Sequence, residues 1–416
     1  MSSLTRCICA VLAILLPASL SMGADGDELA QALGELRNSI ERSEHELRDM
    51  PAFGSDAERA GAYMHLSRML LRSLEEHVLQ DPDYPYFRVL DQRIREGGDN
   101  ADQRYLFSPI RPGATYRIWG DRGSATRVEF QLYAGKPWSG SGRVAGFLDF
   151  DTLAMSPEGA FEVYLSPQHM GENWLENAAD TDTLIVRQIY ADWSAEYPGQ
   201  IHIDRVDTLG TPRPTYTAAN VAARLRAAAQ EMYSATTVWP KFVAQRYLER
   251  MPANTVSPLM DTAAYGGVNG RWMANGHFEL HPDEVLLIRT WPTNAAYQGL
   301  QLTDLWFASL DYADRVSSLN THQALLAPDG SYYFAVSASD PGYANWLDTG
   351  GLERGVFLLR FDGLKQEIPR TQWPSVQLLK RAELREAIPG FTDVSAEARA
   401  ETLRERRRHV QVRYND

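Results

Sequence analysis

Two aspartates in the second half of the chain are the residues whose types and spacing best fit acid/base chemistry. Asp340 and Asp348 flank Asn345-Trp346-Leu347, and a pair of carboxylates is what hydrolysis of a glycosidic or amide bond uses. The alternative is structural, because Asp340 precedes Pro341-Gly342 and is an ordinary turn former there. We take both aspartates as catalytic candidates. The substrate-binding candidates are Asn100, Asp102, Tyr105, Trp306, Tyr312, Asn320, Asn345 and Trp346.

A cluster of oxygen-bearing side chains forms a second candidate feature. Asp99, Asn100 and Asp102 lie close together in the sequence, and Tyr105 follows them. A calcium loop would place such ligands at alternate positions and end in a bidentate glutamate, and that pattern is absent. We therefore expect no metal here, and two interpretations stay open: a loop that contacts a ligand, or a structural turn.

Other kinds of catalysis have no motif in the chain. His277 and His281 have the spacing of a helical zinc site, but Leu280 and Pro282 place them on a strand and a turn. The sequence contains no Gly-x-Ser-x-Gly elbow, phosphate-binding loop or dinucleotide fingerprint. We expect no cofactor and no metal. A Ser-His-Asp triad assembled from distant positions stays open.

The chain repeats one pattern in its two halves. Asn173-Trp174-Leu175 recurs as Asn345-Trp346-Leu347, an offset of 345 − 173 = 172, and Arg187 recurs as Arg360, an offset of 173. Arg117 and Arg289 fit the same register, since 289 − 117 = 172. The repeat predicts two β-rich units of one design. Because Asn-Trp-Leu occurs in both, its tryptophan is favoured as a core anchor over a stacking platform for a ligand.

Composition limits the partners. The chain has 416 residues, 44% of them hydrophobic, which is enough for a large core in two or three domains. It carries 54 acidic and 41 basic side chains, for a formal net charge of −13. Such an acidic chain repels phosphate backbones, so we expect no nucleic-acid partner and no docking on anionic lipid.

The N-terminus has the pattern of a secretory signal. Arg6 precedes an apolar run, Cys7 to Leu16, that is too short to span a bilayer, and small residues up to Ala24 mark a cleavage zone. We expect a periplasmic or secreted protein cleaved near Ala24, with no transmembrane segment in the mature chain; a retained anchor is the alternative. Cys7 and Cys9 lie inside this signal, so the mature chain has neither disulfides nor a thiolate nucleophile.

Hydrophobic periodicity then divides the chain. We expect strands of alternating pattern in two units, a helical hairpin before them and a helical segment between them that Pro240 interrupts. Ser55-Asp56-Ala57-Glu58 is expected to form a capping box that opens the second helix of the hairpin. A strand is expected at Thr321–Leu326 and a helix at Leu379–Ala387. The cluster of Arg404, Arg406, Arg407 and Arg408 is expected at a solvated helix end, and anion binding is the alternative. The full division is a signal peptide at 1–24, a helical hairpin at 25–96, a first β-sandwich unit at 97–210, a helical insert at 211–265, a second β-sandwich unit at 266–370 and C-terminal helices at 371–416.

Several motifs resemble a known family. They are Gly97-Gly98-Asp99-Asn100-Ala101-Asp102-Gln103-Arg104-Tyr105, Tyr297-Gln298-Gly299-Leu300-Gln301-Leu302 with Asp304 and Trp306, Ser317-Ser318-Leu319-Asn320 with Gln323, and Asp340 to Thr349. Over roughly Gly97 to Leu364 the chain resembles the uncharacterised family called domain of unknown function 1214, which is related to two-domain 1254/1214 proteins. The resemblance implies jelly-roll-like β-sandwich domains in an exported bacterial protein, without an established mechanism.

These patterns together predict a mainly β fold with helical additions (α+β), built from two jelly-roll-like antiparallel β-sandwich units related by an internal repeat. The functional hypothesis is a periplasmic hydrolase acting on a small polar or glycan-like substrate. The alternative is a non-catalytic ligand-binding or assembly module. Formation of a homo-oligomer stays open.

Overall fold

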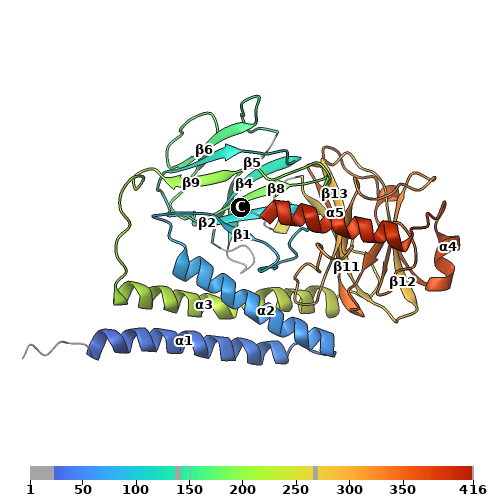
Figure 1. Cartoon of the computed structure of the whole chain (residues 1–416), viewed down its shortest axis with the longest axis horizontal. Helices are drawn as coiled ribbons and strands as arrows, with labels where there is room; N and C mark the ends of the chain where they lie inside the picture. Colours follow the sequence, from blue (N-terminus) through green and yellow to red (C-terminus); the bar gives the residue numbers. More distant parts are fainter. Residues whose placement is uncertain (1–22, 136–141, 150, 266–269, 415–416) are drawn as a thin grey trace, which may run out of the picture.

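The computed structural model describes residues 23–135, 142–149, 151–265 and 270–414. Two β-rich bodies lie side by side next to a layer of helices, and a C-terminal helix runs along the second body and ends at the first (Figure 1). The expected signal peptide, residues 1–24, lies outside the described residues except for Gly23 and Ala24, which begin the first helix. Among the described helices, none has the length and apolar character needed to cross a membrane.

The first β unit is a sandwich of two sheets, ordered β1-β2-β8-β4-β5 and β7-β6-β3-β9. Residues at alternate positions, such as Phe130 and Leu132 or Val163 and Leu165, point from both sheets into one apolar core. The strands are β1 (Arg88–Leu90), β2 (Gln103–Pro109), β3 (Tyr116–Asp121), β4 (Arg127–Ala134), β5 (Arg143–Asp149), β6 (Ala160–Ser166), β7 (Trp174–Glu176), β8 (Thr183–Ile189) and β9 (Ile201–Arg205).

The second β unit repeats this arrangement, with sheets ordered β10-β11-β17-β13-β14 and β16-β15-β12-β18. Leu286, Ile288 and Phe334 belong to its apolar core. The strands are β10 (Met260–Asp261), β11 (Trp272–Glu279), β12 (Glu284–Thr290), β13 (Tyr297–Thr303), β14 (Ser318–Asn320), β15 (Tyr332–Ser337), β16 (Trp346–Asp348), β17 (Arg354–Asp362) and β18 (Ser375–Lys380). Two sandwich-like, jelly-roll-like units in a mainly β chain confirm the expected fold class.

The internal repeat is confirmed strand by strand. Trp174 lies opposite Tyr164, and Trp346 lies opposite Ala335 in the same parallel pairing of the second unit. One expected equivalence is wrong. Arg289 lies opposite Tyr333, whereas the residue at the corresponding ladder position of the first unit, opposite Glu162, is Trp119 and not Arg117. A shift of two residues keeps side chains on the same face of a strand, so the sequence pattern does not reveal it.

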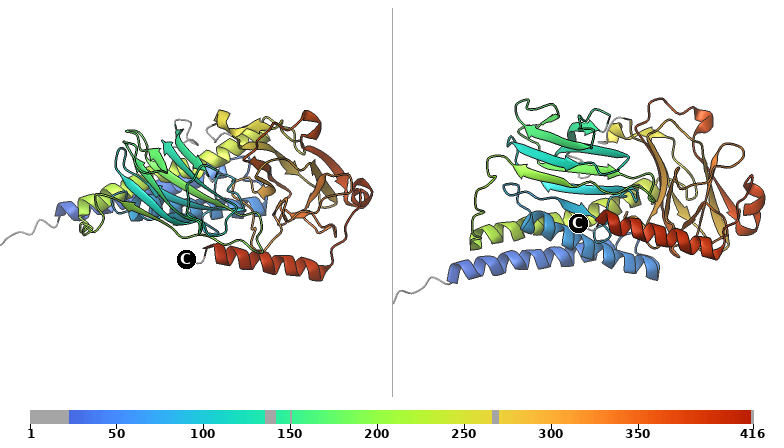
Figure 2. Two further views of the ribbon diagram at one scale, coloured as in Figure 1. Left: turned by 90° about the horizontal axis from the view of Figure 1, so that it is seen from above. Right: turned by 45° about the horizontal axis from the view of Figure 1, so that its top comes forward.

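The helices form a layer beneath the first unit that reaches the near side of the second (Figure 2). The layer contains α1 (Gly23–Arg48), α2 (Asp56–Leu74), the π-helical turn η1 (Glu75–Leu79), α3 (Ala218–Val243) and the π-helical turn η3 (Ala244–Leu248). The predicted capping box is present, since Ser55 and Glu58 each accept a backbone N–H of the other at the start of α2.

The expected interruption at Pro240 does not occur, because α3 continues through it into η3. Proline lacks the N–H that would bond to the carbonyl of Thr236. That carbonyl instead lies 2.9 Å from Nε2 of His65 on α2. Burial lowers the pKa of His65 to about 4, so the ring is neutral near pH 7 and donates this hydrogen bond. A side chain from the neighbouring helix thus replaces the missing intrahelical bond.

Two other expected elements are wrong. No strand forms at Thr321–Leu326, because Oδ1 of Asn320 accepts the backbone N–H groups of His322 and Gln323 and turns the chain there. The expected helix at Leu379–Ala387 is only a short one, α4 (Leu384–Ala387), after a 3-10 turn. Leu379 and Lys380 belong instead to β18, which pairs with β12 and extends the second unit beyond residue 370. Likewise β1 joins the first unit before residue 97.

Candidate functional site

The two catalytic candidates have separate partners. Asp340 forms an ion pair with Arg399, 3.0 Å between Oδ2 and Nε, and accepts the backbone N–H of Gly342. Asp348 forms an ion pair with Arg315, 2.7 Å between Oδ2 and Nη1, and accepts the N–H of Gly350. Among the described residues, no hydrogen bond or common partner joins the two aspartates. Each stabilises its own turn, which is the structural alternative stated for Asp340.

Asn345 and Trp346 are held by backbone groups of their own unit. The side chain of Asn345 bonds both the N–H and the carbonyl of Leu325, and Trp346 Nε1 donates to Ser337. The first unit makes the same bonds with Asn173 to Ala154 and Trp174 to Ser166. The repeated contacts explain why Asn-Trp-Leu occurs twice, without a ligand.

Trp306 and Tyr312 lie in the interior. Trp306 packs in the apolar cluster between the second unit and the helices, and its Nε1 donates to the carbonyl of Glu58. The hydroxyl of Tyr312 lies 3.1 Å from that of Tyr414. Both side chains are buried, so neither lies at the surface where a substrate-binding residue would contact its ligand.

The other binding candidates, Asn100, Asp102, Tyr105 and Asn320, gather at the boundary of the two units. Asp102 is 1% exposed. Its Oδ1 accepts from Trp193 Nε1 at 2.8 Å and from the amide of Asn320 at 3.1 Å, and its Oδ2 accepts from the hydroxyl of Tyr297 at 2.5 Å. Asn100 joins this network through Tyr297 and donates its backbone N–H to Tyr105. Three of the four family-like motifs therefore converge in space.

The C-terminal helix α5 (Ala396–Tyr414) supplies residues that sequence reasoning missed. Arg406 donates to the carbonyls of Tyr312 and Ser318, and Arg413 donates to the carbonyl of Ala101. Both guanidinium groups lie over the ring of Trp193, at 4.5 and 4.6 Å from its centre. Arg406, expected in a solvated cluster with Arg404, Arg407 and Arg408, is buried. Arg406 and Arg413 are seven residues apart and therefore lie on one helix face. This spacing could have indicated that both are buried.

His409 completes the cluster between the two arginines. Burial and the charge of Arg413 lower the pKa of His409 to about 2, so it is neutral. Burial raises the pKa of Asp102, against the opposing effects of Tyr297, Arg413 and Arg406. A network of this kind, closed to solvent and with its carboxylate bonded on both oxygens, joins the two units and α5. It does not present a reactive group to a substrate.

A second buried network crosses the same boundary. Arg271, just before β11, contacts Glu129 of the first unit at 2.6 Å and Asp362 of the second at 2.9 Å. Both carboxylates are buried. A paired charge removed from water depends on its partner, since an isolated one is strongly disfavoured. Arg271 is therefore a second residue that holds the units together.

Asp304, within one of the family-like motifs, should make stability depend on pH. Burial raises its pKa to about 6, although it accepts the N–H groups of Trp306 and Ala308. Between about pH 4 and 6 the folded chain keeps a proton that the unfolded chain has lost, so the free energy of unfolding falls as pH rises. We expect Asp304→Asn to reduce the fall in the free energy of unfolding between pH 4 and pH 7.5 by about 2 kcal/mol. Urea unfolding at the two pH values measures it. An equal effect of the substitution at both pH values would contradict the prediction.

An open groove with a volume of about 600 Å³ lies at one end of the sheet β16-β15-β12-β18. Its lining residues are Asp283, Pro341, Lys380, Arg381, Ala382, Leu384, Arg385 and Phe391. Pro341 belongs to the family-like motif from Asp340 to Thr349. Lys380 pairs with Asp283 at 3.0 Å, and Arg385 pairs with Asp393. Arg381 donates to the carbonyl of Asp340 at 2.5 Å, and among the described residues no carboxylate pairs with it.

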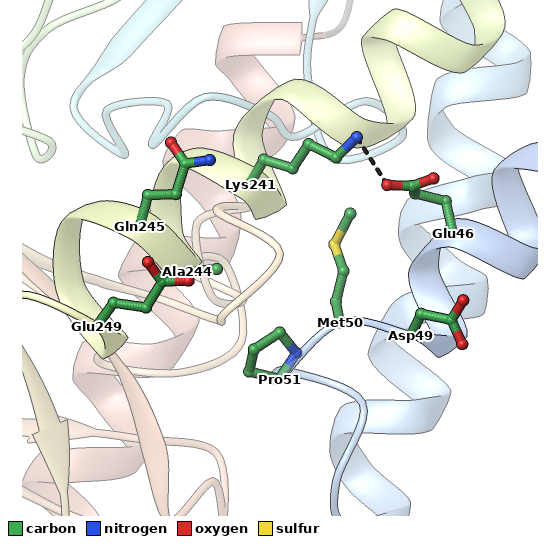
Figure 3. Close-up of a pocket in the computed structure, with 8 residues that line it drawn as sticks. All are labelled: Glu46, Asp49, Met50, Pro51, Lys241, Ala244, Gln245 and Glu249. Carbon is green, nitrogen blue, oxygen red and sulfur yellow. Dashed lines mark ion pairs between the residues drawn. The ribbon is translucent and has the colours of Figure 1, made fainter.

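A smaller pocket of about 180 Å³ lies between the end of α1 and the α3–η3 junction (Figure 3). Figure 3 shows Lys241 and Glu46 facing each other across one side, with an ion pair of 2.7 Å. Met50 and Pro51 line it as well. This volume is below the usual size of metabolite pockets, and the groove is within their range. In the described part of the chain, no group of histidine, cysteine or acidic residues has a geometry that could hold a metal.

The chain matches solved structures of other proteins. The crystal structure of an uncharacterized protein from Burkholderia cenocepacia has a TM-score of 0.79 and 28% identity, covering 86% of this chain and 99% of that chain. The VPA0106 protein from Vibrio parahaemolyticus has a TM-score of 0.43 and 12% identity, covering 77% of this chain and 98% of that chain. No family model and no curated protein matches the chain. The first structure supports the fold and brings no function with it.

Proposed function

We propose that the chain is an exported, non-catalytic binding protein of the 1214 family that takes a small anionic ligand in the groove at Arg381. The groove carries this proposal, because it combines a ligand-sized volume with basic side chains and the apolar groups of Pro341 and Phe391. The pattern of residues 1–24 supports export to the periplasm, and the motifs from Gly97 to Thr349 support the family.

Charge favours an anionic ligand. The chain as a whole has a formal net charge of −13, yet three basic residues, Lys380, Arg381 and Arg385, meet in one groove. Lys380 is paired with Asp283 and Glu284 and Arg385 with Asp393, so the cation without a carboxylate partner among the described residues is Arg381. The guanidinium of Arg381 is bonded to a backbone carbonyl, so its charge is available to a ligand carboxylate. Phe391 lies under Arg385, 4.3 Å from the guanidinium carbon to the ring centre, and offers an apolar wall.

The hydrolase hypothesis stays a prediction with less support. It needs two carboxylates that act on one bond. Asp340 and Asp348 are instead each engaged with an arginine and a turn N–H. A binding role makes no such demand, so the groove favours it.

Replacing Arg381 by alanine should weaken binding of phthalate, which has a flat apolar ring and two carboxylates, by about ten- to a hundredfold. A hydrogen bond to a charged group contributes about 1.5–3 kcal/mol. Isothermal titration measures the dissociation constant for both proteins. The matched control is Arg404→Ala, which removes an arginine paired with Glu401 on the exposed face of α5. Equal affinity in the Arg381 variant, or no binding of phthalate, benzoate or glutarate to the unaltered protein, would reject the groove as the site.

A further inference from the structure

The repeat provides an internal comparison between two equivalent edge strands. β9 is the last strand of the sheet β7-β6-β3-β9, and β18 is the last strand of β16-β15-β12-β18. Tyr116 lies opposite Leu165 and Arg205 in the first unit, and Leu286 lies opposite Val336 and Leu378 in the second. Arg205 and Leu378 therefore occupy the same ladder position in the two units.

The edge of the first unit is protected. Arg205 forms ion pairs with Asp83 and Asp207. The loop that contains Asp83 is held by a second contact, because the hydroxyl of Thr208 donates to the carbonyl of Asp83 at 2.6 Å. A charged residue on an edge strand, together with a loop that covers it, is how β proteins prevent another chain from adding to the sheet.

Among the described residues, the edge of the second unit carries no charge at this ladder position. Leu378, at the position of Arg205, is 43% exposed. The five residues Ser375 to Leu379 carry no charge, and Ser375 and Gln377 are exposed as well. Within the described residues, the backbone of this stretch pairs with β12 on one side, and no backbone hydrogen bond to it is recorded on the other. An edge strand whose only charge is at its last residue, Lys380, leaves the preceding five residues as a template for strand addition.

The basic groove begins where this edge strand ends. Lys380 is the last residue of β18, and Arg381 and Arg385 follow it. An extended segment added antiparallel to β18 would bring its N-terminal end to these cations. Self-pairing of two copies of β18 would place the two basic ends at opposite ends of the pair. Arg381 of each copy would then face residues 370–375 of the other, which contain no carboxylate. The combination of open edge and basic end therefore favours a different, acidic chain as the occupant.

We propose that β18 receives an extended acidic segment of a partner protein, which adds a strand to the sheet and places its acidic end in the groove at Arg381. This deepens the proposed function and rests on it, since it identifies the anionic ligand as a peptide. The backbone hydrogen bonds of β18 supply strand pairing, and Leu378 gains an apolar neighbour. The cations at the end of the strand supply the preference for acidic sequences.

The probe is a blocked peptide of two glutamates followed by five alternating threonine and valine residues. A second peptide of the same sequence carries N-methyl groups on alternate residues, which removes strand pairing and keeps the charge. We expect the first peptide to bind and the N-methylated one to bind at least tenfold more weakly, as measured by isothermal titration. Leu378→Lys should weaken the first peptide, while Leu209→Lys, at a 63% exposed leucine of the first unit, should not.

The outcomes separate the two proposals. If both peptides bind equally, the groove holds them by charge alone; the strand addition is then wrong and the proposed function stands. If phthalate binds and neither peptide does, the strand addition is also wrong. If no anionic probe binds, both proposals fail. If the chain alone forms a dimer that Leu378→Lys dissociates, the occupant is a second copy and the acidic partner is rejected.

Discussion

Replacing Asp102 by alanine is expected to lower the free energy of unfolding by about 3–5 kcal/mol, which is the cost of removing one member of a buried charge network. The substitution removes the acceptor of Trp193, Asn320 and Tyr297. It also leaves the buried guanidinium groups of Arg406 and Arg413 without the carboxylate that attracts them. Urea unfolding followed by fluorescence and by circular dichroism measures the change.

Two further substitutions make this test specific. Asp102→Asn keeps the shape and one acceptor oxygen, so we expect a smaller loss than for alanine. Asp49→Ala removes an exposed carboxylate whose ion pair with His45 is at the surface, and should change stability by less than about 1 kcal/mol. A loss for Asp102→Ala no larger than for Asp49→Ala would mean that the boundary network does not hold the units together.

Replacing Arg271 by methionine is expected to cost a similar amount, about 3–5 kcal/mol. The methionine fills much of the same space, but Glu129 and Asp362 are then left buried without their shared cation. Arg127 lies 3.8 Å from Glu129 and compensates only in part. Because the two carboxylates belong to different units, their repulsion acts directly on the boundary. The same unfolding measurement reports it.

A combined variant distinguishes charge from packing. When Glu129→Gln and Asp362→Asn accompany Arg271→Met, neither carboxylate remains as a buried charge without Arg271, and we expect much of the lost stability to return. Arg143→Met provides the control, since it breaks an exposed ion pair with Asp180 that should contribute no more than about 1 kcal/mol. If the triple variant is as unstable as Arg271→Met alone, packing and not charge explains the loss.

The boundary networks also bear on the functional hypotheses. Four of the residues expected to bind substrate, Asn100, Asp102, Tyr105 and Asn320, do meet in space, but they bind one another and the chain. Their family-like motifs are thus explained by the contact between units. The open groove lies elsewhere, at the end of β18, and among the motif residues Pro341 reaches it. A ligand-binding role therefore depends on residues that no motif marked, chiefly Arg381 and Phe391.

The sequence by itself determined those features that depend on neighbours along the chain. Alternating apolar residues predicted most strands, Ser55 and Glu58 predicted the start of α2, and the recurrence of Asn-Trp-Leu predicted two equivalent units. These are local effects of side-chain alternation, capping and turn formation. They also explain the local errors. The chain after Asn320 turns because of that side chain's own oxygen, and Pro240 stays within α3 because His65, on another helix, replaces its missing donor.

Only the tertiary structure decided which residues share a site. The contact of Asp102 with Tyr297 joins positions 195 apart, and that of Arg413 with Ala101 joins positions 312 apart. Such pairings follow from how the sandwiches and α5 pack, and residue spacing does not encode them. For the same reason the sequence placed Arg406 in solvent and Asp340 with Asp348 in one site. Burial against a distant element, rather than residue type, determined whether each charge became a structural partner or remained available to a ligand.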